Sequence, residues 1–235
     1  MPLPSDVADR GRAILASLFP EPAPPGEYAL ALALLEEGQG QSLDFGRLVA
    51  RWVDHQAGPF ECPAVAASVA GLAQFGAPPT AAATGPGLGG ALVTLPFVAR
   101  LAGNPRNLVA GLYHLARLLD PDPVADFSAV AVGVTAACFL GGRRDFVPDV
   151  LDVLIGNDAP PPLIEEVRRV PVWRRAEPGP GADPVEAAVG RLGTLLWGVR
   201  HDPEGWADRL AGSGPSAVRL GRTLAFLQAR VTSGG

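Results

Sequence analysis

The sequence contains no lysine, so arginine supplies all 19 of its basic residues. The 24 acidic residues outnumber them and give a formal net charge of −5 at pH 7. A mildly acidic chain without a long basic stripe is poorly suited to nucleic acid, whose phosphates are bound by clustered cations. We therefore expect no nucleic-acid partner.

Cysteine is also scarce: only Cys62 and Cys138 are present, both in apolar surroundings. Two cysteines in a chain of this size do not make a disulfide framework, so we expect free, buried thiols and a cytoplasmic protein. Residues 1–20 carry acids early and lack the apolar core of a signal peptide. The most apolar stretch, 124–142, contains Asp126 and falls short of the ~20 apolar residues that span a bilayer. We expect a buried central helix there and no membrane partner.

Aromatic residues make up only 6% of the chain, and Ala, Val and Leu fill its apolar positions. This mix favours closely packed helices over strands. No stretch alternates with the two-residue period of a strand, whereas helical periodicity recurs throughout. We therefore predict an all-α fold in a single domain. The predicted helices lie at 5–18, 27–38, 43–56, 63–75, 89–102, 105–118, 123–140, 144–156, 161–169, 184–200, 203–211 and 215–231.

Four of these helices share one start signal, an Asn or Asp followed by Pro, at 104–105, 122–123, 183–184 and 202–203. The side-chain oxygen can accept from free main-chain N–H groups, and Pro loses nothing there because its missing N–H would be unpaired anyway. The segments 76–88 and 170–183 are long for helix connections. They are expected to line a functional surface, either intact or eroded.

Motifs with a recognised chemistry are few. The segment "GPGLGG" (85–90) lacks a following Lys-Ser or Lys-Thr and a preceding strand, so it is interpreted as a flexible start of a helix. The three histidines lie on different predicted elements without ligand spacing, which argues against a zinc site. His114 is interpreted as a core or groove histidine, with a catalytic base as the minority alternative.

The densest basic stretch is "RRVPVWRR" (168–175). Trp173, Arg174 and Arg175 could hold a phosphate or nucleotide by stacking and bidentate pairing. The favoured interpretation is a solvated segment balanced by the acids at 165–166. The acid pairs 36–37 and 149/152 are also interpreted as solvated helix faces.

Four longer segments carry a family resemblance. They are "EYALALALLEEG" (27–38) with "DFGRLVARWVDHQ" (44–56), "GLGGALVTLPFVARLAG" (87–103), "LARLLDPDPVADFSAVAVGVTAACFLGG" (115–142) and "GPGADPVEAAVGRLGTLLWGVRHDPEGW" (179–206). In this order they resemble segments of the ADP-ribosylglycohydrolase family, over roughly residues 23–212. The resemblance implies a single-domain, orthogonal multi-helix bundle of that family's type over 1–235, with a divergent N-terminal segment at 1–22.

The resemblance also implies a chemistry. Members of this family hold two divalent cations, usually magnesium, with carboxylates and Thr hydroxyls from an early Asp-Asp-Thr loop and a late Asp-Thr-Asp-Thr loop. Hard cations require such oxygen clusters. The metals position ADP-ribose and polarise the bond that joins it to a protein side chain.

Most of these ligand positions have changed in this chain. The early loop corresponds to Pro24, Pro25 and Gly26, which offer no side-chain oxygen. The late loop corresponds to Gly181, Ala182, Asp183 and Pro184, so one acid of two remains and both hydroxyls are gone. The family's Thr-His pair corresponds to Leu119 and Asp120. One carboxylate does not replace a cluster of oxygen donors. We therefore predict that Asp183 is a helix cap and that no metal cofactor is bound.

Two hypotheses about function follow. The leading one is a member of the family that has lost its metal site and acts as a non-catalytic binding or structural module. Its partner would be a protein or a small molecule resembling ADP-ribose. The alternative is a hydrolase with altered chemistry that removes ADP-ribose or a related glycosidic group in the same cleft. Its candidate residues are Asp183, Asp120 and Glu27, with His114 nearby, and it needs two carboxylates in one pocket.

Overall fold

The structure is a computed structural model that describes residues 6–20, 25–38, 43–54, 59–79, 85–172, 181–203, 210 and 214–232. Over these residues every regular element is helical. The helices are α1 (Val7–Leu18), α2 (Pro25–Glu37), α3 (Phe45–Asp54), α4 (Pro63–Phe75), α5 (Gly89–Thr94), the 3₁₀ turn η1 (Leu95–Phe97), α6 (Val98–Leu101), α7 (Pro105–Leu119), α8 (Pro123–Leu140), α9 (Val147–Gly156), α10 (Pro161–Arg169), α11 (Pro184–His201) and α13 (Pro215–Thr232). The all-α prediction is confirmed. The predicted helix at 203–211 lies almost wholly outside the described residues.

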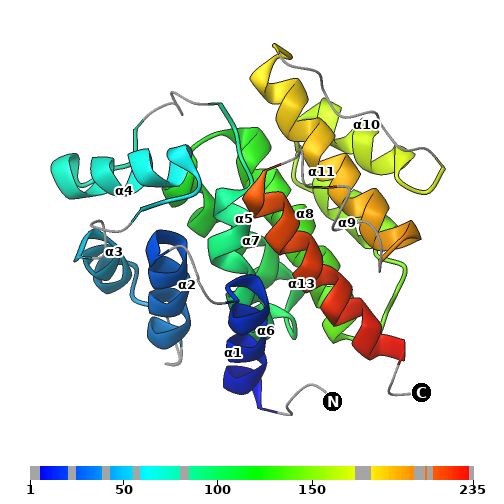
Figure 1. Cartoon of the computed structure of the whole chain (residues 1–235), viewed down its shortest axis with the longest axis horizontal. Coiled ribbons are helices and arrows are strands. Elements are labelled where there is room, and N and C mark those ends of the chain that lie inside the picture. The colour runs from blue at the N-terminus through cyan, green and yellow to red at the C-terminus, as the bar shows by residue number, and fades with distance from the viewer. Residues whose placement is uncertain are drawn as a thin grey trace.

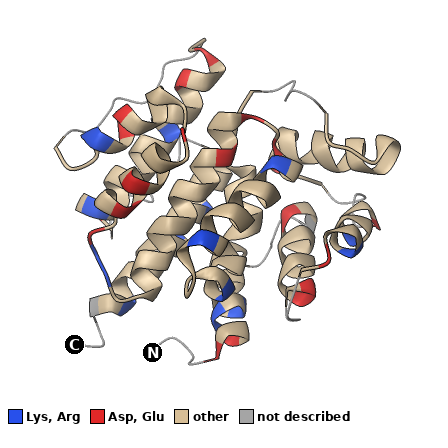
Figure 2. Cartoon of the chain, turned by 180° about the vertical axis from the view of Figure 1, so that it is seen from behind, with Lys and Arg blue, Asp and Glu red and all other residues tan. Residues whose placement is uncertain are grey.

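The helix α8 forms the centre of the molecule and packs against α5, α7, α9, α11 and α13. Figure 1 shows α2, α3 and α4 on one side of it and α9, α10 and α11 on the other. By length and composition α8 could cross a membrane, with a mean hydropathy of 1.7, but 83% of its 18 residues are buried inside the protein. It is therefore the central core helix that the sequence predicts. Figure 2 shows the basic and acidic residues as separate bands on helices that are otherwise mostly uncharged.

The predicted start signals are present at three of the long helices, α7, α8 and α11, the last of which begins after Asp183. Asp122 accepts a 2.8 Å hydrogen bond from the N–H of Val124 at the start of α8. Asn104 accepts one of 3.2 Å from Asn107 in α7. Each side chain pairs an N–H that the helix itself leaves free, which fixes where the chain turns into the helix.

The predicted helix at 89–102 is divided in three. It runs as α5, then η1, then α6, and Pro96 lies inside the 3₁₀ turn. Proline has no N–H to donate to the preceding turn, so the α-helical hydrogen-bonding pattern cannot pass through it. The predicted helix at 144–156 likewise begins later, at Val147, with Pro148 in its first turn.

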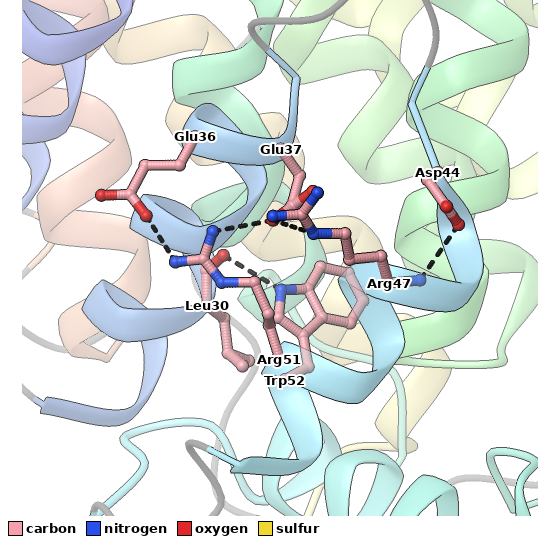
Figure 3. Close-up of polar contacts among 7 residues, drawn as sticks. All are labelled: Leu30, Glu36, Glu37, Asp44, Arg47, Arg51 and Trp52. Atoms are coloured by element: carbon pink, nitrogen blue, oxygen red, sulfur yellow. Dashed lines mark hydrogen bonds and ion pairs between the residues drawn. The ribbon is translucent and has the colours of Figure 1, made fainter.

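The helix α2, which carries a candidate residue, is fixed to α3 by the polar network in Figure 3. Arg51 donates to both Glu36 and Glu37, the latter at 3.0 Å, and Arg47 lies 3.2 Å from Glu37. The indole N–H of Trp52 donates to the Leu30 carbonyl at 3.1 Å. The side chain of Glu37 is only 7% exposed. The expectation of a simple solvated face is therefore wrong for Glu37, which pairs across the helix interface.

Candidate functional site

The first candidate carboxyl group, Glu27, lies in the first turn of α2 and is completely buried. Its Oε1 accepts a 2.8 Å hydrogen bond from the main-chain N–H of Cys62, while its Oε2 is buried without a hydrogen-bond partner. Burial raises the pKa of Glu27, and the Cys62 N–H opposes that rise by favouring the charged form. The preceding residue, Gly26, packs so closely on the Phe60 ring that a Cβ there would lie 2.5 Å from a ring carbon.

The second candidate, Asp120, ends α7 and is also completely buried. Its Oδ2 accepts a 2.9 Å hydrogen bond from the N–H of Gly87, and its Oδ1 has no partner. Burial raises the pKa of Asp120 to about 7; the Gly87 N–H opposes this rise, and the charge of Asp122 adds to it. A carboxyl group with such a pKa is mostly protonated below neutral pH and about half ionised at pH 7.

Cys62 connects the two carboxyl groups. It lies directly before α4, donates its N–H to Glu27, and is 8% exposed. A Cβ built on Gly87 would lie 3.4 Å from its Sγ and 3.5 Å from the Asp120 Oδ2. Burial raises the pKa of the Cys62 thiol, and the charges of Asp120 and Glu27 raise it further. The thiol is therefore the free, buried group that the sequence predicts.

The segment 85–88, called the strap below, packs against Asp120 and Cys62. Besides the Gly87 hydrogen bond, the Pro86 carbonyl accepts from Arg191 of α11 at 3.2 Å. Gly85, with a φ of 74°, packs against Pro184 so closely that a Cβ would lie 2.5 Å from the proline Cβ. A pocket of about 150 Å³ remains beside the strap, lined in part by Cys62, Gly87, Arg191 and the start of α13. The strap thus joins Asp120 to the first turn of α11.

Asp183 is the residue immediately before α11. Its Oδ1 accepts from the N–H groups of Val185 at 2.9 Å and Glu186 at 3.2 Å, and the residue is exposed. The predicted helix cap is therefore present. Asp183 does not share the burial of Glu27 and Asp120, so of the three candidate acids only two lie around Cys62.

The other candidate residues lie elsewhere. His114 is exposed on α7 and lines two grooves on the outside of that helix, with volumes of about 890 and 630 Å³. The prediction that His114 lies in a groove is confirmed, and the alternative that it lies in the core is wrong. Trp173, Arg174, Arg175 and Pro24 lie outside the described residues. Gly181 is exposed with a φ of 86°, and Pro184 is the first residue of α11.

Two buried acids, Asp126 and Glu166, were not singled out as candidates by the sequence. Glu166, in α10, is 3% exposed, so the expectation of a solvated acid is wrong there. Asp126, in the first turn of α8, is fully buried and neither of its oxygens has a hydrogen-bond partner. Burial raises its pKa to about 7, and the Arg117 guanidinium, 3.5 Å from Oδ2, opposes the rise. The sequence offered one signal that Asp126 is buried: it is a charged residue inside the most apolar stretch of the chain, 124–142.

The order of these elements agrees with one protein family. A family model described as ADP-ribosylglycohydrolase matches residues 26–229. The chain belongs to the ADP-ribosylglycohydrolase family. The match extends beyond the resembling region at 23–212 and includes most of α13.

The fold agrees with that assignment. The chain is similar to a solved structure, an ADP-ribosylglycohydrolase-related protein complex, with a TM-score of 0.62 and 19% sequence identity. The similarity covers 97% of this chain and 87% of that one. No curated protein matches the chain by sequence. The predicted fold type of the ADP-ribosylglycohydrolase family is confirmed.

The donors around Cys62 do not fit the two magnesium ions that the resemblance implies. Each magnesium requires about six oxygen ligands in near-octahedral geometry and usually keeps several waters. Glu27 and Asp120 each have one oxygen paired to a main-chain N–H and one closed off from solvent. Within the described ranges, no cluster of three or more His, Cys, Asp or Glu side chains could hold a metal ion.

Proposed function

We propose that this protein is a member of the ADP-ribosylglycohydrolase family that does not hold paired magnesium ions and acts as a non-catalytic binding or structural module. The proposal rests on the burial and the hydrogen bonds of Glu27 and Asp120. Both carboxyl groups are fully buried, and each is engaged by a main-chain N–H from a different segment. They join separate segments of the fold: Glu27 joins α2 to the residue before α4, and Asp120 joins the end of α7 to the strap.

The surroundings of these acids support the same proposal. Gly26 lies against the Phe60 ring, the strap lies over Cys62, and Asp183 uses its carboxylate to cap α11. Helix packing keeps such a scaffold folded without its metal ligands, because the apolar core carries most of the stability. The partner would be a protein or a small molecule resembling ADP-ribose, and the module would need no cofactor.

The proposal is tested by isothermal titration of the protein with magnesium chloride and, separately, with ADP-ribose. We expect no two-site magnesium binding, and the same weak heats for the Asp183→Asn variant as for the wild type. Micromolar binding of two magnesium ions that is lost in Asp183→Asn would overturn the proposal. A response to ADP-ribose without magnesium would support a binding module for that ligand.

The convergence of Glu27 and Asp120 on Cys62 favours one alternative, a hydrolase with altered chemistry. A carboxyl group whose pKa lies near 7 is suited to act as a general acid. The decisive assay measures release of ADP-ribose from modified arginine by the wild type and by the variants Asp120→Asn and Asp183→Ala. Turnover that only Asp120→Asn abolishes would establish the alternative, and no turnover by the wild type would remove it.

A further inference from the structure

A groove on the outside of α7, called the α7–α9 groove below, is separate from the Cys62 pocket. It has a volume of about 890 Å³, and its described lining residues include none of those that line the pocket beside the strap. The lining comes from α7, from the start of α8, and from the second half of α9 with the residues that follow it. Pockets for small organic ligands typically have volumes of about 300 to 1,000 Å³, so the groove is large enough for one.

Aromatic rings from α7 and α8 line one part of this groove. The centroid of the Tyr113 ring lies 5.3 Å from that of Phe127 and 5.8 Å from that of His114. The Tyr113 hydroxyl accepts a 3.0 Å hydrogen bond from Arg117, whose guanidinium lies 3.5 Å from the buried carboxyl group of Asp126. These contacts hold the Tyr113 ring in place. Faces of such rings bind flat apolar groups and attract cations.

The part of the groove formed by α9 and the residues after it carries two acids, Asp152 and Asp158. Both residues are exposed, and within the described ranges neither side chain has an ion pair or a hydrogen bond. Arg106, in the first turn of α7, is the arginine of the lining, so two negative charges stand against one positive charge. Charge complementarity therefore favours a positively charged ligand over an anion.

The backbone at Asp158 supports a role for its carboxylate. Among the described residues other than glycine, Asp158 is the one with a left-handed backbone, at a φ of 53°. Its N–H donates to the Ile155 carbonyl at 3.3 Å, a hydrogen bond that any residue except proline could make. Glycine adopts this conformation without steric cost and is the usual residue at such a helix end. Aspartate adopts it at a small cost and adds a negative charge to the groove.

We propose that the α7–α9 groove binds a small organic cation. Its flat apolar body lies against Tyr113 and Phe127, and its ammonium group lies beside Asp152 and Asp158. The groove selects amines over anions of the same shape. This inference goes beyond the proposed function and does not rest on it, because neither magnesium nor ADP-ribose enters its test. The two proposals therefore fail separately.

Three probes that share one body and differ in charge test the proposal. Tryptamine, tryptophol and 3-indolepropionate carry an ammonium, a hydroxyl and a carboxylate on the same indole ring and two-carbon linker. Each is titrated into the isotope-labelled protein at neutral pH, and the shifted NMR resonances give both the affinity and the location. We expect tryptamine to bind about tenfold or more tightly than 3-indolepropionate, with tryptophol between them.

The shifted resonances should cluster at 105–114 and 152–158. Equal affinities for the three probes would overturn the proposal. Resonance shifts confined to another part of the molecule would overturn it too, and so would a lack of tryptamine binding at millimolar concentration.

Asp158→Gly separates binding from folding. It removes the carboxylate and relieves the left-handed backbone, so its melting temperature should be no lower than that of the wild type. Tryptamine should bind about threefold to fivefold more weakly, and tryptophol should stay within about twofold. Asp54→Asn is the matched control, because it removes an exposed acid on α3, outside the groove lining. Equal weakening of tryptamine by both variants, or of all three probes by Asp158→Gly, would overturn the proposal.

A second copy of the chain is the other occupant that such a groove could take. Sedimentation velocity over about a fortyfold range of protein concentration separates the two, because a dimer dissociates on dilution. We expect the sedimentation coefficient to be the same with and without tryptamine. A dimer that either tryptamine or the Asp158→Gly substitution dissociates would overturn the proposal.

Discussion

Glu27, in the first turn of α2, accepts a 2.8 Å hydrogen bond from the main-chain N–H of Cys62, the residue directly before α4. This contact ties together two segments 35 residues apart in the chain. Glu27→Ala would leave the Cys62 N–H buried without an acceptor and create a cavity. We expect it to lower the free energy of unfolding by about 2 to 3 kcal/mol, measured by urea denaturation.

Glu27→Gln is the matched control, because its amide oxygen still accepts from Cys62 and its volume is similar. It should cost less than about 1 kcal/mol, because the hydrogen bond is kept and no cavity is left. Equal losses in the two variants would mean that the hydrogen bond contributes nothing and that the side chain acts only by filling space.

Local features of this fold were predictable from the sequence, whereas contacts between distant segments, such as that of Glu27 with Cys62, were not. The starts of α7, α8 and α11 were predictable because Asn or Asp followed by Pro is a local signal that acts within three residues. The break at Pro96 is also local, since it follows from a missing N–H, but its extent depends on how the chain packs on either side.

The site itself was only partly predictable. Glu27 and Asp120 were candidates because they lie within the resembling segments, and Asp183 was correctly expected to cap a helix. No local pattern places Cys62 between the two acids, because that depends on how α2, α4 and α7 pack together. Glu37 was misjudged for the same reason: its partners Arg47 and Arg51 belong to another helix.

The buried acid Asp126 makes the stability of the protein depend on pH. Its pKa is raised from 3.8 to about 7, so the fold favours the protonated form. The stability this group contributes is fully present below about pH 4 and is lost as the pH rises through 7. Asp126→Asn should flatten this dependence and be more stable than the wild type at about pH 8, by on the order of 2 kcal/mol. Denaturant titrations at several pH values test this, and a slope unchanged from the wild type would contradict it.

The cap at Asp183 should contribute to stability. Asp183→Ala removes the acceptor for the N–H groups of Val185 and Glu186. We expect a loss of about 1 kcal/mol and a fall in the melting temperature of about 2 to 4 °C. Asp183→Asn can make the same hydrogen bonds and should stay within a degree or so of the wild type. Thermal unfolding followed by circular dichroism measures both, and a large loss in the Asn variant would point to a role for the charge.

Arg51 should matter more than its partial exposure suggests. It binds the nearly buried carboxylate of Glu37 at 3.0 Å. Without Arg51, the ionic partner of Glu37 among the described residues would be Arg47 (Figure 3). Arg51→Ala is expected to cost about 1 to 2 kcal/mol, and Glu36→Gln, at the exposed end of the network, less than about 0.5 kcal/mol. Urea denaturation at low and high salt compares the two. Similar small losses would show that the buried end of the network is no stronger than its exposed end.

Gly87 in the strap and Gly89 at the start of α5 should tolerate a methyl group very differently. A Cβ on Gly89 would lie 2.5 Å from the Cys62 Sγ and 2.6 Å from a methyl carbon of Val65, so the start of α5 would have to move away from α4. A Cβ on Gly87 would meet its nearest neighbours at 3.4 and 3.5 Å, which is ordinary contact. Gly89→Ala should lower the free energy of unfolding by about 2 to 3 kcal/mol and Gly87→Ala by less than about 1 kcal/mol. Equal losses of stability at both positions would contradict the close packing of α5 against Cys62.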